Sequence, residues 1–102
     1  MNFANKHVYI TGSNRGIGLA FAKYAASLGC HLHLLNRSTI ADRDKQELVE
    51  KGVASVEEIT VDLLDRESMD NVLAELEHKQ IDVFINNAGL LTGGLIEEQP
   101  LD

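Results

Sequence analysis

A glycine-rich loop near the N-terminus, placed between a β-rich run and a helical pattern, constrains the fold more than any other feature. The β-rich run extends from His7 to Thr11 (HVYIT) and is followed directly by Gly12. After the loop, apolar residues recur at the spacing of one helix face. They are Ile17, Ala20, Phe21, Tyr24, Ala25 and Leu28. We therefore predict a strand, a tight loop and a helix that ends at Gly29.

The remainder of the chain continues this alternation of strand and helix. The predicted elements are a strand at Leu32 to Leu35, a weaker helix at Asp42 to Lys51, a strand at Val56 to Val61, a helix from Asp65 to Lys79, and a strand at Ile81 to Ile85. Asp65 is the predicted N-cap of its helix. Strands that alternate with helices predict an α/β fold with a parallel sheet. The length fits a single domain over residues 1–102.

The loop itself, TGSNRGIG at Thr11 to Gly18, has the composition of a phosphate cradle. Gly12 permits a sharp turn, Gly16 lets a pyrophosphate approach the backbone, and Gly18 permits close packing of helix against strand. The first turn of the helix offers unpaired N–H groups and the positive end of its dipole to an anion. A plain glycine-rich turn is the alternative, but the strand–loop–helix context favours phosphate binding.

Three motifs in this order resemble the short-chain dehydrogenase/reductase family. They are the Gly-x-x-x-Gly-x-Gly loop, Asp62-Leu63 after the third strand, and Asn86-Asn87-Ala88-Gly89 after the fourth. The resemblance extends from Lys6 onward. It implies a truncated Rossmann fold, with strand order 3-2-1-4 and helices on both faces, and it implies that residues 1–102 form one NADP-binding half-domain.

Two residues at the end of the second strand bear on the choice of coenzyme. NAD-specific proteins place a carboxylate there to bind the ribose 2′-hydroxyl, whereas this chain has Asn36 followed by Arg37. A guanidinium can pair with a 2′-phosphate that a carboxylate would repel. Arg15 in the glycine loop is a second candidate for this phosphate. We predict NADP(H) as the cofactor, with solvated surface arginines as the alternative.

The resemblance assigns the coenzyme contacts to four places along the chain: the glycine loop, the end of the second strand, the acidic residue after the third strand, and the motif after the fourth. These residues are Gly12, Ser13, Asn14, Arg15, Gly16, Ile17, Gly18, Asn36, Arg37, Asp62, Leu63, Asn87, Ala88 and Gly89. It also implies that Thr11 and Asn14 order the loop and that Asn86 ties the fourth strand to its neighbours. Asp62 would accept from the adenine amine, or else cap a helix or turn.

The catalytic residues of the resembled family, a serine and a Tyr-x-x-x-Lys pair, lie later in the chain than residue 102. Tyr9 and Tyr24 are followed four residues on by Ser13 and Leu28, and we predict both tyrosines to be core or near-core residues. The family's activity is NADP-dependent oxidation or reduction of an alcohol or carbonyl. We expect no catalytic residues here, and therefore coenzyme binding without the family's normal mechanism. A non-catalytic dinucleotide-binding or oligomerising module is the alternative.

The composition and charge of the chain bear on which partners it can bind. The net charge of -7, without a cluster of Lys or Arg, argues against nucleic-acid binding. No apolar run approaches the ~20 residues that span a bilayer, and the first residues do not read as a secretory signal, so we expect a cytoplasmic protein. Cys30 is predicted to be a core residue. His31 and His33 share a strand face, but without a third ligand we predict no metal site.

The fourth predicted strand suggests self-association. Ile81 to Ile85 is apolar and would form the sheet edge, which is a template for pairing. The helix before it would leave part of an apolar face uncovered. We therefore predict a homo-oligomer, as a dimer, through fourth strands or uncovered sheet faces.

Overall fold

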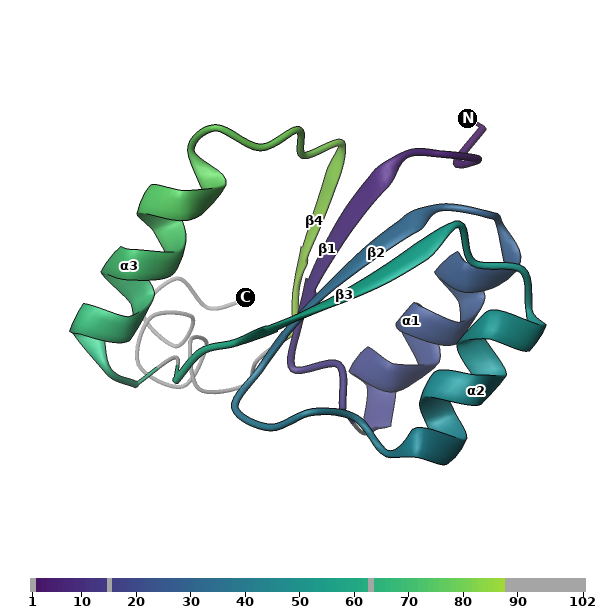
Figure 1. The fold of residues 1–102 in the computed structure, drawn as a ribbon, viewed down its shortest axis with the longest axis horizontal. Helices are drawn as coiled ribbons and strands as arrows, with labels where there is room; N and C mark the ends of the chain where they lie inside the picture. Colours follow the sequence, from purple (N-terminus) through teal and green to yellow (C-terminus); the bar gives the residue numbers. More distant parts are fainter. Residues whose placement is uncertain (1, 15, 63, 88–102) are drawn as a thin grey trace, which may run out of the picture.

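The described part of the chain forms a four-stranded parallel sheet with helices on both faces, as predicted (Figure 1). The structure is a computed structural model that describes residues 2–14, 16–62 and 64–87. The elements are β1 (His7–Thr11), α1 (Gly16–Ser27), β2 (His31–Asn36), α2 (Asp42–Glu50), β3 (Ser55–Thr60), α3 (Arg66–Leu76) and β4 (Val83–Asn86). The strand order is β3-β2-β1-β4, which confirms the predicted 3-2-1-4 arrangement.

β1 forms the centre of the sheet because it pairs with strands on both sides. Ile10 lies opposite Leu34 of β2 and Ile85 of β4, and Leu34 in turn lies opposite Glu58 of β3. Because all four strands are parallel, their carboxyl ends meet at one edge of the sheet, next to the start of α1. Ligands of open α/β sheets bind at this edge.

Helices α1 and α2 cover one face of the sheet, and α3 covers part of the other (Figure 1). The core on the side of α1 and α2 contains buried residues from both helices and both central strands. It comprises Val8, Ile10, Ala22, Ala25, Ala26, Cys30, Leu32, Leu34, Ile40 and Leu48. The α3 side has a smaller core of Tyr9, Leu35, Val61, Val72 and Leu76. The burial of Cys30 confirms its predicted core position.

The predicted core face of α1 is mostly wrong, since Ala25 is its only buried member. Ile17, Phe21 and Tyr24 are 68%, 44% and 65% exposed, and α1 instead buries Gly18, Ala22, Ala25 and Ala26. This helix carries two apolar stripes, and close approach to the sheet selects the stripe of small residues. Of the two tyrosines predicted to be core or near-core residues, only Tyr9 is buried.

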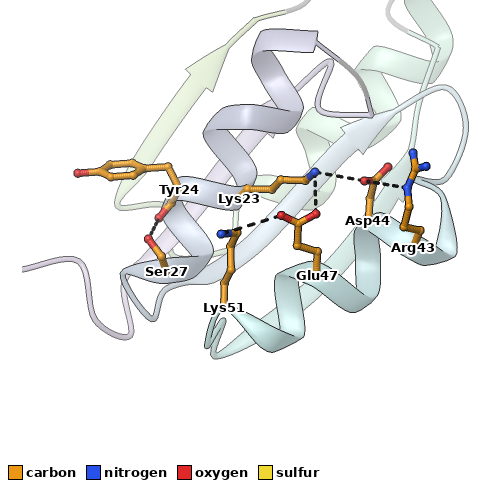
Figure 2. A network of polar contacts seen from close by, with 7 residues as sticks. All are labelled: Lys23, Tyr24, Ser27, Arg43, Asp44, Glu47 and Lys51. Carbon is orange, nitrogen blue, oxygen red and sulfur yellow. Dashed lines mark hydrogen bonds and ion pairs between the residues drawn. The ribbon is translucent and has the colours of Figure 1, made fainter.

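Ion pairs hold α1 against α2 (Figure 2). Nζ of Lys23 on α1 lies 3.3 Å from the carboxylate of Asp44, which is buried, and 2.9 Å from the carboxylate of Glu47. Lys51 lies 4.0 Å from the same Glu47 side chain. Tyr24 points away from this network, to the side of α1 that α2 does not occupy (Figure 2). The ion pairs therefore fix one flank of α1 and leave its apolar stripe exposed.

Several predicted boundaries shift by one to three residues. β4 begins at Val83 rather than Ile81, and Asp82 bonds to His7 at the start of the β1–β4 pairing. The Asp82 carboxylate accepts from the His7 backbone N–H at 2.8 Å, and the Asp82 N–H donates to the His7 carbonyl at 3.0 Å. α3 ends at Leu76, and Asp65 caps it by accepting from the Glu67 N–H, as predicted. No helix among the described residues is long and apolar enough to cross a membrane.

Candidate functional site

The carboxyl ends of β1 and β4 are tied together by a polar network that includes the glycine loop. The Thr11 hydroxyl donates to Asn86 Oδ1 at 3.0 Å and accepts from the Asn87 backbone N–H at 2.9 Å. Asn87 Nδ2 then donates to the carbonyl oxygen of Gly12 at 3.1 Å. The Asn86-Asn87 pair thus fixes the first residue of the loop from the end of β4. This agrees with the tie between strands that the resemblance implies for Asn86.

The glycines of the loop have distinct physical roles. Gly12 and Gly16 adopt φ angles of +64° and +61°, a conformation that other residues rarely adopt. Gly18 begins the packed face of α1. A Cβ placed on Gly18 would lie closer than 3.0 Å to the Gly12 carbonyl oxygen and 2.6 Å from Asn87 Nδ2. The close packing predicted for Gly18 is therefore against the loop and the residue after β4.

The surface at Gly16 is open. Apart from its chain neighbours and its own helix backbone, a Cβ built on Gly16 would meet no atom of a described residue within 4 Å. Gly16 is also the first residue of α1, whose first N–H groups lack partners within the helix. This combination provides room and hydrogen-bond donors for an anionic group at the end of the sheet. The residues present therefore fit the phosphate-binding role expected of this loop.

Asn36, the last residue of β2, is buried and bonded to the glycine loop. Its Oδ1 accepts from the Ser13 backbone N–H at 2.6 Å and from the Ser13 hydroxyl at 3.2 Å. Its Nδ2 is also buried, but it finds no hydrogen-bond partner within the described part of the chain. Such unpaired buried donors are rare in folded proteins. The sequence placed Asn36 at the site, but it did not reveal the bond to Ser13 or the unpaired amide.

The residues that follow Asn36 lie beside the glycine loop and are exposed. Arg37 is exposed, and among the described residues no carboxylate forms an ion pair with it. Beside it, Asn14 Nδ2 donates to the Ser38 hydroxyl at 3.3 Å and links the glycine loop to the segment after β2. Ser38 is a residue that the sequence analysis missed. Arg15, the second predicted phosphate ligand, lies outside the described residues.

Asp62 forms a turn between β3 and α3. Its Oδ1 accepts from the Leu64 N–H at 3.0 Å, and its own N–H donates to the Ser68 hydroxyl at 3.1 Å. This agrees with the role in a turn that the sequence offered for Asp62 as the alternative to a contact with the adenine amine. Ile17, in the first turn of α1, is exposed beside the loop. Leu63, Ala88 and Gly89 lie outside the described residues.

His7, His31 and His33 form a stacked cluster on the α3 face of the sheet. His33 stacks on Tyr9 with ring centroids 4.0 Å apart, and His7 lies between His31 and His33 at 4.6 and 5.1 Å. His7 Nδ1 and His33 Nε2 share a hydrogen bond of 2.9 Å. His33 Nδ1 also contacts the Glu57 carboxylate. Within residues 2–14, 16–62 and 64–87, no group of three or more potential ligands is arranged to hold a metal ion.

Known proteins resemble the chain both in sequence and in structure. The short chain dehydrogenase family model matches residues 6–102. A CLA biosynthesis dehydrogenase/reductase of Lactiplantibacillus plantarum is 33% identical over 102 residues, which cover 97% of this chain and 35% of the relative. The 3-dehydrosphinganine reductase TSC10B of Arabidopsis thaliana is 35% identical, over 92% of this chain and 28% of that protein.

Two solved structures have the same fold and contain coenzymes. L-Sorbose reductase from Gluconobacter frateurii, solved with NADPH and L-sorbose, is 37% identical with a TM-score of 0.70, over 87% of this chain and 36% of that chain. An NADH-dependent reductase solved with NAD is 30% identical with a TM-score of 0.72. The match covers 85% of this chain and 37% of that chain.

The parallel sheet in the order 3-2-1-4, with its glycine loop at the carboxyl edge, defines a Rossmann-like domain. The match over residues 6–102 is more specific, and the chain belongs to the short-chain dehydrogenase family. It spans about a third of the length of the curated relatives it matches, 35% and 28% for the two above.

Proposed function

We propose that the edge formed by the ends of β1, β2 and β4 binds NADP(H). The observation that carries this proposal is the open surface at Gly16 in the first turn of α1, where a backbone with φ of +61° leaves room for a pyrophosphate. Thr11 and Asn87 hold the other end of the loop in place. Asp62 would accept from the adenine amine with the carboxylate oxygen that the turn does not use.

Support for the phosphorylated coenzyme comes from the residues at the end of β2. Solved relatives contain either NAD or NADPH, so family membership alone does not choose between them. Here the last residue of β2 is the uncharged Asn36, and the exposed Arg37 follows it. A free guanidinium pairs with phosphate through charge-assisted bonds, and no carboxylate at the end of β2 would repel that phosphate. Arg15 is the second proposed phosphate ligand.

The activity we propose for the whole protein is NADP-dependent oxidoreduction of a carbonyl or alcohol. Relatives at 33% and 35% identity carry the names dehydrogenase/reductase and reductase. The coenzyme supplies the hydride, and the described residues bind and orient it. The 102 residues contain no Tyr-x-x-x-Lys pair, so this polypeptide alone would bind the coenzyme without reducing a carbonyl. A non-catalytic binding module is the second candidate function.

Calorimetric titration with NADP, NAD and ADP-ribose tests this proposal. NADP should bind most tightly, and Arg37→Gln should reduce the NADP affinity about tenfold or more while changing the NAD affinity much less. Arg43→Gln is the matched control, because Arg43 is an exposed arginine on α2. Equal affinities for NADP and NAD would contradict the 2′-phosphate assignment. Failure of all three nucleotides to bind would refute coenzyme binding by this chain.

We further propose that the 102-residue chain forms a homodimer. Among the described strands β4 pairs only with β1, and Phe84 on β4 is 46% exposed. The apolar stripe of α1 (Ile17, Phe21 and Tyr24) is also exposed, on the flank opposite α2. The four named side chains are uncharged, so they can meet those of a second copy despite the net charge of -7. A monomer in sedimentation equilibrium at micromolar concentration would contradict the proposal, and Tyr24→Lys should weaken the dimer.

A further inference from the structure

A row of side chains crosses all four strands on the α3 face of the sheet. Tyr9 of β1 lies opposite Phe84 of β4 and His33 of β2, and on the other side of His33 lies Glu57 of β3. The Tyr9 ring is nearly parallel to both ring neighbours, with centroids 4.0 Å from His33 and 6.5 Å from Phe84. His33 Nδ1 contacts the Glu57 carboxylate at the end of the row. Side-chain contacts therefore join the strands here in addition to the backbone hydrogen bonds.

His7 links this row to the first residues of the strands. Its ring stacks on His31 with centroids 4.6 Å apart, and its Nδ1 lies 2.9 Å from His33 Nε2. His31 Nδ1 in turn lies 2.7 Å from the Ser55 hydroxyl at the start of β3. The His7 backbone bonds to Asp82, immediately before β4. The three histidines therefore connect the amino ends of all four strands, at the edge of the sheet opposite the glycine loop.

Hydrogen-bond chemistry limits the protons that His7 and His33 can carry together. A carboxylate only accepts, so His33 Nδ1, which contacts Glu57, must carry a hydrogen. The contact between the two rings then needs one hydrogen: either His7 Nδ1 donates to His33 Nε2, or His33 Nε2 donates to His7 Nδ1. In either arrangement at most one of the two rings is positively charged. Two charged rings would direct N–H against N–H across 2.9 Å.

Groups from every neighbouring element face these two rings. The charged and titratable ones are Tyr9 from β1, His31 from β2, Glu57 from β3, and Lys6 and Asp82 before the starts of β1 and β4. Helix α3 packs against this face with the apolar side chains of Val72 and Leu76. Burial raises the pKa of Tyr9, and the His7 backbone N–H lowers the pKa of Asp82. Tyr9 therefore stays neutral and Asp82 stays negative over the range in which imidazoles titrate, about pH 5 to 8.

We propose that His7 and His33 form an acid-sensitive latch that holds the amino ends of the strands together. With one proton the pair keeps its shared hydrogen bond, and the carboxylates of Glu57 and Asp82 balance the charge. A charged His33 also lies against the face of the Tyr9 ring, which attracts cations. A second proton places two like charges side by side and removes the acceptor from the shared bond. The strand ends then separate, so that acid opens the edge of the sheet opposite the glycine loop.

Urea unfolding of the 102-residue chain between about pH 8 and pH 5 tests the latch. In acid the unfolded chain carries two protons on these rings and the closed fold carries one, so stability should fall with pH. The folding equilibrium constant should drop by up to about tenfold per pH unit from this pair. His7→Gln removes the second charged ring, so its stability should fall less steeply, by up to the same factor. His78→Gln, at an exposed histidine after α3, is the matched control and should keep the wild-type slope.

Parallel pH profiles for the wild-type chain and His7→Gln would overturn the proposal. If His7→Gln does not fold, the ring nitrogen resonances of the wild-type chain decide. His7 and His33 should take up one proton between them while the native spectrum persists, and the second proton should enter only as the native spectrum is lost. Uptake of two protons by the native pair, or of none, would overturn the latch. Neither experiment involves a nucleotide, so both outcomes are independent of coenzyme binding.

Discussion

Two single-methyl substitutions in the glycine loop should separate its structural role from its binding role. Gly18 and Gly16 are two residues apart, and each would receive one methyl group as alanine. The methyl on Gly18 would lie 2.6 Å from Asn87 Nδ2 and 2.8 Å from the Gly12 carbonyl carbon. Among the described residues outside its own helical turn, the methyl on Gly16 would meet nothing within 4 Å. The same chemical change is therefore crowded at one site and uncrowded at the other.

The expected magnitudes follow from these contacts. Forcing a methyl against backbone atoms costs about 1–3 kcal/mol, and losing the Asn87–Gly12 hydrogen bond adds about 0.5–1.5 kcal/mol. We therefore expect Gly18→Ala to lower the free energy of unfolding by about 2–4 kcal/mol. For Gly16→Ala only the φ of +61° is unfavourable, at about 1–2 kcal/mol. Alanine's smaller unfolded-state entropy offsets about 0.4–1 kcal/mol of that cost.

Thermal unfolding, urea unfolding and nucleotide titration of both variants provide the assay. A loss of about 1 kcal/mol lowers Tm by about 4–8 °C in a domain of this size, so the two stabilities should be clearly distinguishable. Gly16→Ala should retain most of its stability but lose affinity for ADP-ribose, because its methyl would occupy the space proposed for the pyrophosphate. If Gly18→Ala is no less stable than Gly16→Ala, the loop can relax, and the argument from close packing is wrong.

Two further predictions concern titratable groups outside the loop. The backbone N–H of His7 lowers the pKa of Asp82 below its ordinary 3.8, aided by Gln80 and Lys6. This carboxylate therefore stabilises the fold above pH 3.8, and that stabilisation is lost as pH falls through the lower folded-state pKa. Urea midpoints of wild type and Asp82→Asn should differ at neutral pH and converge in acid, and a constant difference would contradict the assignment. Burial raises the pKa of the Cys30 thiol, so a disulfide reagent at pH 8 should modify Cys30 only as the protein unfolds; rapid modification of the native protein would show that the core opens.

The sequence was sufficient for the elements and their order because the signals involved are local. The run HVYIT, the periodic segment after the loop and the glycine at position 29 each depend on neighbouring residues. The strand was confirmed to the residue, and the helix ends two residues before Gly29. Asp65 as a helix cap was confirmed for the same reason, since a cap contacts a residue only two positions away. Motif spacing also placed Asn36, Asn86 and Asn87 at one edge of the sheet.

Other features depend on residues that are distant in sequence. The Ser13–Asn36 bond spans 23 residues and the Thr11–Asn86 bond spans 75, and no periodicity encodes either one. The stacking of His7 with His31 and His33 likewise follows from the register between β1 and β2. These contacts decide which donors and acceptors remain available to a ligand, and they can be identified only in the folded chain.

Helix α1 shows both what the sequence determines and what depends on the tertiary structure. The sequence alone determined that residues 16–27 form a helix next to a glycine loop, because helix propensity, periodicity and the loop glycines act locally. Only the tertiary structure decided which of its two apolar stripes is buried. Hydrophobicity favoured Ile17, Phe21 and Tyr24, but the space beside Gly18 admits only small side chains. Steric fit between helix and sheet, which a linear pattern does not contain, overrode the larger apolar area of the exposed stripe.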